Sequence, residues 1–434
     1  MNRRTDEKAG KFSRRGFLKT SAAVSLAALG PGASRIFAAG AEKIRYGVIG
    51  FGGRAAGAAS NAVFADPAVE IVAVGDLFDD HIDESMDKLI NGSQWVTKVP
   101  KEKVKVTKET RFTGFDSHKG VLACDVDVVI LASPPHFRPM HLKACVEAGK
   151  HVFMEKPVAV DPVGVRSIIA SSDLAKEKGL AVVSGTMKRH DPRYIEIMKR
   201  IHRGDIGELV AGQCYNNTGS LWIKPRQPQW SDMEWQIRNW LYFTWLSGDH
   251  IVEQHIHNID AVNWAFGTHP VKCLGIGGRE VRTDPKWGNI YDHFTVEFEY
   301  ANGARILSMC RQMDGCSDRM SERVVGTKGV ADMDRHEITG ANPYKYVGEP
   351  ADPYIQEHKD LIAGVRDGKP LNEGRQVAES SLTAIMGRMS AYTGRELSWD
   401  WAMNASKLDL SPAKYEFGEL PVEPVAVPGK TPLV

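Results

Sequence analysis

The sequence lacks the features that mark several large protein classes. Only six of its 434 residues are cysteines, and no two of them form a C-x-x-C pair, which leaves no zinc or disulfide-exchange motif. The formal net charge is +1, so we expect no nucleic-acid partner. No repeat at a fixed period occurs, which excludes solenoids and propellers. The length suffices for two domains with cores of their own, and a hydrophobic content of 42% is ordinary for a globular protein.

The first 41 residues differ from the rest of the chain. Arg14 and Arg15 precede an uncharged, alanine-rich stretch over residues 20–34, and small residues occupy positions 39–41. This layout is typical of a twin-arginine signal peptide. The stretch is too short and too interrupted by glycine and proline to cross a membrane as a helix. We therefore expect an exported, periplasmic or otherwise extracytoplasmic protein with no stable membrane span after cleavage of residues 1–41.

A glycine-rich turn follows the first stretch of β-type sequence. Residues 44–49 lead into the pattern G-x-G-x-x-A at 50–55, and a helix of small residues follows. In such a turn Gly50 permits the tight bend, and Gly52 lets the backbone approach a pyrophosphate. The pattern predicts a dinucleotide site at the start of the helix. The first candidate cofactor-binding residues are Gly50, Phe51, Gly52, Gly53 and Arg54.

An acidic residue, Asp76, ends the next predicted strand, residues 69–75. A carboxylate at this place accepts hydrogen bonds from the adenosine ribose hydroxyls and would repel a 2′-phosphate. Leu77 and Phe78 follow, so no arginine is placed there to bind such a phosphate. The expected cofactor is NAD, and NADP is the less favoured alternative.

Two further predicted strands also end in polar or constrained residues. The strand over 126–132 stops at 133–136, and the strand that begins at His151 leads to Glu155-Lys156-Pro157. Alternating strands and helices predict an α/β Rossmann domain, a doubly wound parallel sheet over 42–186, in which ligands lie at the carboxyl ends of strands. The candidate cofactor-binding residues in these two segments are Ser133, Pro134, His136, His141, Glu155 and Lys156.

Beyond residue 186 the pattern changes. Long β-type runs cover 293–300 and 305–309, and helices are predicted near 138–148 before this boundary and near 191–203, 250–266, 353–367 and 375–393 after it. Runs of strands with separate helices predict an α+β domain with an open, mostly antiparallel sheet. We assign residues 187–410 to this domain and 411–434 to a C-terminal tail.

The stretch LSGDHIVEQHIHNID, residues 246–260, is rich in histidine and acid. On a continuous helix His250, Glu253, His257 and Asp260 share one face, whereas His255 points away from them. Such a stripe could hold a metal, move a proton, or belong to a polar surface helix. A metal site would need further ligands from elsewhere in the chain.

At this point the chain resembles the Gfo/Idh/MocA family, that is, glucose–fructose oxidoreductase, inositol dehydrogenase and their relatives. The stretches that carry the resemblance are VIGFGGRAAG, AGKHVFMEKP, GTMKRHDPRY, GDIGELVAGQCY and GDHIVEQHIHNID. They extend over almost the whole chain from about Lys43 to Asp400. The resemblance implies a Rossmann domain followed by an α+β domain whose open sheet commonly packs against another subunit. A homo-oligomer, either a dimer or a tetramer, is therefore expected.

The resemblance also implies catalytic residues. The lysine of the EKP motif matches Lys156, and the later motif of acid, histidine and acid matches Glu253, His257 and Asp260. The family usually has aspartate where Glu253 stands, and glycine where His255 stands. Hydride transfer needs no metal, so none is expected: His257 would act as general base, Glu253 would orient its ring, and Lys156 would hold the developing alkoxide. His250 and His255 are expected to pack or to cap helices.

Aromatic and polar residues after the last Rossmann strand would form a pocket for a polyhydroxylated substrate. The candidate substrate-binding residues are Arg189, Tyr215, Asn217, Arg238, Trp240 and Asp260.

Three functions stay open at this point. The first is an oxidoreductase that acts on a hydroxyl of a sugar, sugar derivative or cyclitol with a tightly held NAD. The second is a redox-neutral, NAD-dependent glycoside hydrolase or lyase that oxidises the hydroxyl transiently. The third is a non-catalytic sensor of a sugar or dinucleotide, against which the joint presence of Lys156, Glu253 and His257 argues. Outside the cytoplasm no pool of free NAD is evident, so we expect the cofactor to be retained and regenerated within the catalytic cycle.

Overall fold

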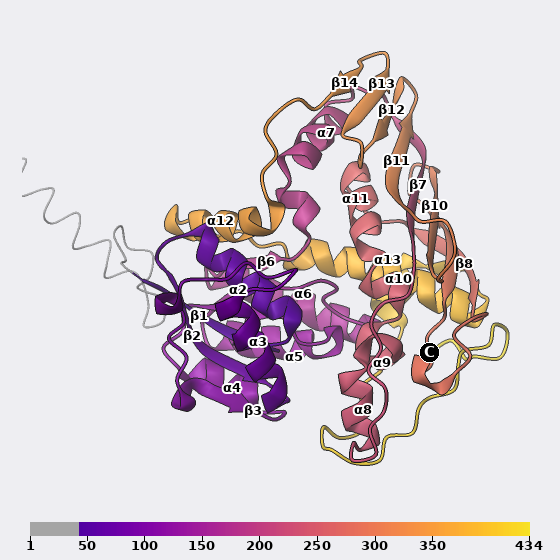
Figure 1. Cartoon of the computed structure of the whole chain (residues 1–434). Helices are drawn as coiled ribbons and strands as arrows, with labels where there is room; N and C mark the ends of the chain where they lie inside the picture. The colour runs from indigo at the N-terminus through magenta and orange to yellow at the C-terminus, as the bar shows by residue number, and fades with distance from the viewer. Residues whose placement is uncertain (1–42) are drawn as a thin grey trace, which may run out of the picture. The chain divides into compact units, whose positions relative to one another are not determined.

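The computed structural model describes residues 43–434, so the predicted signal peptide lies outside the described part of the chain. Within residues 43–434 the strands form two sheets, one of six strands and one of nine (Figure 1). No helix in this part of the chain combines the length and the apolar composition needed to cross a membrane.

The first sheet is wholly parallel, as predicted. Its order is β3 (Arg111–Thr113), β2 (Val69–Asp76), β1 (Ile44–Ile49), β4 (Val128–Leu131), β5 (His151–Met154) and β6 (Val182–Ser184). The helices that follow these strands are α2 (Gly53–Ala65), α3 (Asp79–Asn91), α4 (Ser117–Ala123), α5 (Arg138–Glu147) and α6 (Pro162–Glu177). Every residue of β4 and β5 is buried, because helices cover both faces of a parallel sheet.

One helix from late in the sequence belongs with this sheet. The chain returns to it through α12 (Pro353–Arg366), which packs against α2 and whose Leu361 and Ile362 join the same hydrophobic core as Ile44. The helix itself was predicted, but as part of the 187–410 domain. Sequence order does not say which sheet an amphipathic helix covers, so this assignment needed the tertiary structure.

The second sheet is mostly antiparallel, as predicted, and only the pair β7–β10 in the described chain runs parallel within it. Its order is β14 (Tyr344–Lys345), β13 (Glu337–Gly340), β12 (Gly329–Asp332), β11 (Arg319–Gly326), β7 (Leu209–Thr218), β10 (Arg305–Gln312), β9 (His293–Glu299), β8 (Lys272–Gly278) and β15 (Leu397–Ser398). The helices of this half are α7 (Pro192–His202), α8 (Asp232–Arg238), α9 (Thr244–Ser247), α10 (His250–Glu253), α11 (Ile256–Phe266) and α13 (Gly374–Thr393).

The two faces of the second sheet differ in cover. Helices α10, α11 and α13 lie against one face, where Phe294, Val296 and Phe298 of β9 are buried. Side chains of the opposite parity point to the other face, and there Leu274 and Ile276 of β8 are exposed, Ile276 at 70%. An apolar surface of this kind on an open sheet is a candidate for subunit contact.

The helix predicted over 250–266 is interrupted. It divides into α10 and α11, and Asp249 before it has a positive φ of 71° that breaks the connection to α9. The Asp249 carboxylate accepts a hydrogen bond of 2.6 Å from the backbone nitrogen of His250, so this side chain caps α10. The predicted single stripe of four polar residues is therefore broken between Glu253 and His257.

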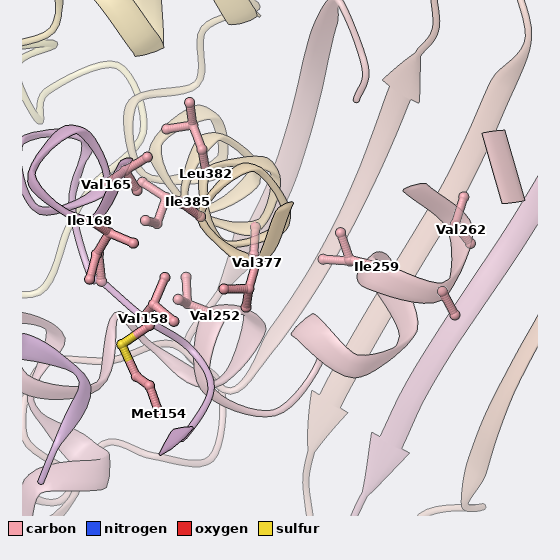
Figure 2. Packing of buried hydrophobic residues seen from close by; sticks show 14 of the residues in the cluster. Met154, Val158, Val165, Ile168, Val252, Ile259, Val262, Val377, Leu382 and Ile385 are labelled. Atoms are coloured by element: carbon pink, nitrogen blue, oxygen red, sulfur yellow. The ribbon is translucent and has the colours of Figure 1, made fainter. Parts of the chain in front are cut away.

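The two halves share a continuous hydrophobic core next to the break. Figure 2 shows Met154 and Val158 from the region of β5 beside Val252 of α10 and residues of α6 and α13. Met154 and Val158 flank Lys156 in the sequence, and Val252 adjoins Glu253. Close packing of these neighbours holds both polar side chains in place.

Candidate active site

The turn after β1 has the shape of a phosphate cradle. Gly50 has a φ of 81°, and a Cβ atom there would lie 2.2 Å from the backbone nitrogen of Ser133, so only glycine fits. A Cβ atom at Gly52 or Gly53 would meet no heavy atom within 4 Å, which leaves open space above the first turn of α2. In the described chain no side chain caps α2 and no acidic residue stands in its first turn. The free N–H groups of this turn therefore fit the pyrophosphate of a dinucleotide.

Asp76 ends β2 at the neighbouring position on the sheet. Its Oδ1 accepts a hydrogen bond of 2.9 Å from the backbone nitrogen of Phe78 and lies 3.3 Å from Nδ1 of His81. These contacts fix the carboxylate at the carboxyl end of the strand, where a ribose hydroxyl can reach its second oxygen.

Residues after β4 close the other side of the cradle. Ser133, buried and in contact with Gly50, forms a hydrogen bond of 3.2 Å with Nδ1 of His141. His141 thus lies behind Ser133 and supports it, and burial lowers the pKa of this histidine to about 3. Pro134 is half-buried beside it, and Nε2 of His136 is hydrogen-bonded at 2.8 Å to the hydroxyl of Tyr415.

Phe51 does not present its side chain to the cradle. The ring is fully buried in the core of the first sheet, so only its backbone is available to a cofactor.

Arg54, the last residue of the predicted cradle set, points to Glu155: Nη2 lies 2.6 Å from Oε1 of Glu155 and 3.6 Å from Glu357 of α12. Burial and the charge of Glu155 raise the pKa of Glu357 well above its usual range. The ion pair between Arg54 and Glu155 connects the glycine-rich turn to the EKP segment.

Lys156 is fixed by Glu253. Its Nζ donates to the backbone oxygen of Glu253 at 2.6 Å and to the carboxylate Oε1 at 3.1 Å. The second carboxylate oxygen of Glu253 accepts a hydrogen bond of 2.5 Å from Gln254. The Glu253 carboxylate thus contacts Lys156, whereas the sequence analysis predicts that it orients His257.

His257 is half-buried and is the second residue of α11, directly after the helix break. Burial lowers its pKa well below the usual 6.5, and the positive charges of Lys156, Lys188 and Arg54 lower it further. The imidazole is therefore neutral at ordinary pH and free to accept a proton. Among the described residues no group of three or more His, Cys, Asp and Glu side chains could hold a metal ion.

Lys188 is a site residue that the sequence analysis missed. It lies in the 3-10 helix Met187–His190, and its ammonium is paired with the buried carboxylate of Glu322 on β11. The same carboxylate accepts hydrogen bonds from Asn258 of α11 and, at 3.0 Å, from the Tyr194 hydroxyl. The position of Lys188 after the last parallel strand was a usable signal, because ligands gather at such ends. Glu322 gave no local signal.

Two predicted substrate-binding residues bind each other. Arg189 donates to both carboxylate oxygens of Asp260, at 2.8 and 2.9 Å, and its guanidinium lies 5.0 Å from the centre of the Trp264 ring. Ser380 of α13 donates a further hydrogen bond of 2.7 Å to Asp260. With its polar atoms occupied in this way, the pair joins α11 to its neighbours, and its substrate role is not supported.

Tyr215 and Asn217 face the side of the second sheet that lies opposite the helices. Their neighbour Asn216 donates to Asn258 of α11 at 3.1 Å, so the even-numbered residues of β7 face the helices. Tyr215 instead lies under the guanidinium of Arg319, 3.8 Å from the ring centre, on the open face. On β7 it is therefore Asn216 that faces α11, which carries His257.

The last two predicted substrate residues lie on α8 and just after it. Arg238 of α8 is bound to Asp80 at 2.8 Å and to Glu234 at 2.9 Å, and it covers the ring of Phe78 at 3.8 Å. It is therefore placed near the end of β2, beside the cofactor region. Trp240 packs edge-on against Trp222 in an apolar cluster.

The two remaining histidines of the polar stretch are buried, as predicted. Nε2 of His255 is hydrogen-bonded at 2.8 Å to Ser308 of β10, and the ring of His250 packs against Phe294. Burial lowers the pKa of His255 to about 3, so this ring is neutral.

Comparison with known proteins gives two family matches. The model of the Gfo/Idh/MocA family described as "Oxidoreductase family, NAD-binding Rossmann fold" matches residues 44–186. The model described as "Oxidoreductase family, C-terminal alpha/beta domain" matches residues 198–361. The first region contains every strand of the first sheet, and the second contains the strands of the second sheet except β15.

Curated relatives match over part of their length. Inositol 2-dehydrogenase 1 of Saccharopolyspora erythraea is 34% identical over 134 residues, 30% of this chain and 38% of that protein. The 2,7-anhydro-N-acetylneuraminate hydratase of Escherichia coli is 26% identical over 219 residues, 50% of this chain and 54% of that protein. The chain thus spans about half or less of these two relatives.

The solved structure of GenD2 from gentamicin A biosynthesis, in complex with NAD, has the same fold. The TM-score is 0.62 at 18% identity, over 85% of this chain and 99% of that one.

Proposed function

The chain belongs to the Gfo/Idh/MocA family of NAD-binding oxidoreductases, and on this premise we propose that it oxidises a hydroxyl of a sugar, sugar derivative or cyclitol, with a tightly held NAD as hydride acceptor. The observation that carries the proposal is the contact of Lys156 with Glu253, close enough to His257 for the lysine charge to lower the pKa of that imidazole. A neutral imidazole can take the proton of an alcohol, and a fixed ammonium can stabilise the negative charge that develops on its oxygen.

The residues divide the chemistry between them. His257 takes the proton of the substrate hydroxyl, and Lys156 donates a hydrogen bond to the same oxygen as negative charge develops on it. The nearby cations make His257 a weak base, and the ammonium of Lys156 offsets this because it makes the hydroxyl more acidic. Bound NAD would supply the acceptor for the hydride of the carbon that carries this oxygen. The glycine-rich turn and Asp76 would hold it.

A single screen tests the proposal. The purified protein is offered a panel of sugars, cyclitols and aryl glycosides with NAD, and both NADH absorbance and the released leaving group are recorded. Substrate-dependent formation of NADH, or of reduced second substrate, supports an oxidoreductase. Ligand binding without any turnover across the panel would contradict the proposal and favour a non-catalytic sensor.

A redox-neutral reaction is the second candidate. The hydratase among the relatives favours it, because that protein is named for a reaction without net oxidation. The same base and the same hydride acceptor serve this chemistry: transient oxidation of a ring hydroxyl acidifies the neighbouring C–H, a glycosidic bond is eliminated, and the hydride returns. Leaving-group release without accumulated NADH in the screen identifies it.

We further propose that the enzyme is exported by the twin-arginine route, on the support of the paired Arg14 and Arg15. Replacing both with lysine is expected to leave the protein in the cytoplasmic fraction of the producing cell. Equal export of this variant and the natural sequence would contradict the proposal.

A homo-oligomer, dimer or tetramer, is proposed from the open face of the second sheet. Leu274 and Ile276 of β8 and Leu307 of β10 are exposed there. Ile276→Glu is expected to lower the mass measured by light scattering to that of a smaller assembly. Ile276→Leu is the matched control, and an unchanged mass in both variants would place the contact elsewhere.

A further inference from the structure

We propose that the segment Ser411–Leu420 of the C-terminal tail is an outer wall of the dinucleotide site, in which Tyr415 and Phe417 retard release of the cofactor. The inference rests on the proposed function in one respect, namely that a dinucleotide occupies the crevice. It adds a part of the site from the far end of the chain, beyond the region matched by either family model.

The segment contacts the loops after three strands of the first sheet. Phe417 stacks on Phe78, two residues after β2, with ring centres 5.9 Å apart, and it lies 5.4 Å from Phe115, two residues after β3. The hydroxyl of Tyr415 is hydrogen-bonded to Nε2 of His136 at 2.8 Å, in the loop after β4. These are aromatic contacts of ordinary geometry, and each is made outside the carboxyl edge of the sheet.

The order of the strands places the segment Ser411–Leu420 over the glycine-rich turn. The sheet runs β3-β2-β1-β4, so β1 lies between the strands that Phe417 and Tyr415 reach. The glycine-rich turn at Gly50–Gly53 stands at the carboxyl end of β1. A connection from the end of β2 to the end of β4 therefore spans the end of β1, where a dinucleotide lies in a sheet of this type.

Both ends of the segment are anchored to the body of the protein. At the far end, the side-chain amide of Gln236 on α8 donates to the backbone oxygen of Leu420 at 2.6 Å, and the backbone nitrogen of Met233 donates to Gly418 at 3.2 Å. At the near end, the backbone nitrogen of Leu410 donates to the buried carboxylate of Asp161 at 2.9 Å. Between these anchors the segment has no helix or strand, so side-chain contacts alone hold its middle against the crevice.

The two aromatic side chains are poised between the crevice and solvent. Phe417 is 48% exposed although it touches two rings, and Tyr415 is exposed to a lesser degree. A buried structural aromatic would show far less surface. Surface of this kind beside a ligand crevice can cover a bound adenosine. Release of the cofactor then requires the contacts of Tyr415 and Phe417 with the three loops to open.

Helix α8 reinforces the same edge. Arg238 covers the ring of Phe78 at 3.8 Å and binds Asp80 at 2.8 Å, while Asp232 of this helix accepts a hydrogen bond of 3.2 Å from the backbone of Leu420. The helix thus holds both the tail and the loop after β2. As long as α8 stays in place, only the middle of the segment needs to move when it opens. Point substitutions at Tyr415 and Phe417 therefore test the middle of the segment while its anchors remain.

The test measures dissociation of NAD from the full protein. The wild type, Tyr415→Ala, Phe417→Ala and the double variant are loaded with NAD, freed of excess nucleotide, and diluted into excess ADP-ribose as a competitor. Bound NAD is then quantified over time after denaturation. We expect the double variant to release NAD at least about tenfold faster than the wild type, with the single variants between them. An increase of this size equals about 1.4 kcal/mol of lost barrier.

Matched variants separate the proposed role from a general loss of stability. Phe64→Ala removes a phenylalanine that is 44% exposed on α2, and this variant is expected to release NAD at the wild-type rate. Tyr415→Phe keeps the ring and loses only the hydroxyl, so a smaller increase is expected. All rates are compared at a temperature where circular dichroism shows each variant to be folded. If the double variant fails to fold, the two single variants carry the comparison.

Two outcomes are decisive against the inference. A wild type that binds NAD and a folded double variant that releases it at the same rate would overturn the role of the tail and leave the proposed function intact. A wild type that binds neither NAD nor NADP would overturn the proposed function and the inference with it.

Discussion

The side-chain amino group of Lys156 donates a hydrogen bond of 2.6 Å to the backbone oxygen of Glu253 and one of 3.1 Å to its carboxylate. The contact joins the segment after β5 to α10 across 97 residues of sequence. Because one acceptor is a backbone oxygen, part of the contact survives any substitution at position 253. The lysine is therefore held by the fold as well as by its ion pair.

Lys156→Met is expected to lower turnover about 10²–10³-fold, since it removes a hydrogen-bond donor to the developing alkoxide. Glu253→Gln is expected to cost less, because the backbone acceptor still places the ammonium. Turnover and NAD binding are measured on the same preparations. Turnover of Lys156→Met close to the wild-type value would remove this residue from the mechanism.

The low pKa of His257 predicts an unusual pH profile. The usual pKa of histidine is 6.5, and in the folded protein burial and three cations hold the pKa of His257 well below it. Its basic form then persists below pH 6.5, so kcat/KM should stay level as pH falls through this value and decline only at lower pH. Lys188→Met removes one of the cations, which should raise the pKa and move the decline to higher pH.

The exposed Lys119 provides the control for that profile. Lys119→Met removes the same charge from a lysine that is not among the cations acting on His257, and it should leave the decline where it is in the wild type. A decline at the same pH in both lysine variants would show that the charge of Lys188 does not act on the base.

Asp76 is expected to select NAD over NADP. Asp76→Ala should reduce this preference, because it removes both the acceptor for the ribose hydroxyl and the repulsion of a 2′-phosphate. Affinities for both cofactors are compared by titration, with Asp87→Ala on the exposed side of α3 as control. Equal affinities in the wild type would contradict the assignment.

Loss of the ion pair between Arg189 and Asp260 should lower the stability of the fold. Arg189→Met leaves an uncompensated buried carboxylate and is expected to lower the free energy of unfolding by about 3–5 kcal/mol. The double variant Arg189→Met/Asp260→Leu should lose less than the sum of its single variants, as measured by denaturant unfolding. Additive losses would mean that the two side chains act independently.

His190 makes stability depend on pH on the alkaline side. Burial alone would lower its pKa, but the carboxylates of Asp360 and Glu373, 2.6 and 3.3 Å from its ring nitrogens, raise the pKa to about 10. The folded value exceeds the unfolded value of about 6.5, so the stabilising contribution is complete below pH 6.5 and is lost as pH rises through 10. The slope reaches at most about 1.4 kcal/mol per pH unit. His190→Gln should flatten the dependence of the unfolding free energy on pH over this interval; an unchanged slope would assign it to other groups.

Much of the first sheet and of the cradle could be read from the sequence. The G-x-G-x-x-A turn, the strand ending at Asp76 and the EKP segment each have a local pattern, and the rule for parallel sheets brings their ends to one edge. Helix limits were close for the same reason: the predicted 191–203 and 375–393 correspond to α7, Pro192–His202, and α13, Gly374–Thr393.

The candidate substrate-binding residues were less predictable, because alternate residues of a strand point to opposite faces of the sheet. Asn216 faces α11 and Asn217 faces the opposite side of the sheet, and a shift of one residue exchanges them. Local sequence shows two neighbouring asparagines after a tyrosine and gives no reason to prefer either. Only the register of β7 against β10 and β11 decides which one faces the helices.

The sequence by itself determined the dinucleotide-type turn, since a short spacing specifies it, and its resemblance to the Gfo/Idh/MocA family singled out Lys156 and His257 as candidates. The tertiary structure alone decided which polar side chains from distant parts of the chain contact each other. Lys188 pairs with Glu322 across 134 residues, and Tyr415 reaches His136 across 279. Contacts at such separations carry no periodic signal in the chain, because they form only after both sheets have packed their helices and brought distant loops to the same edge.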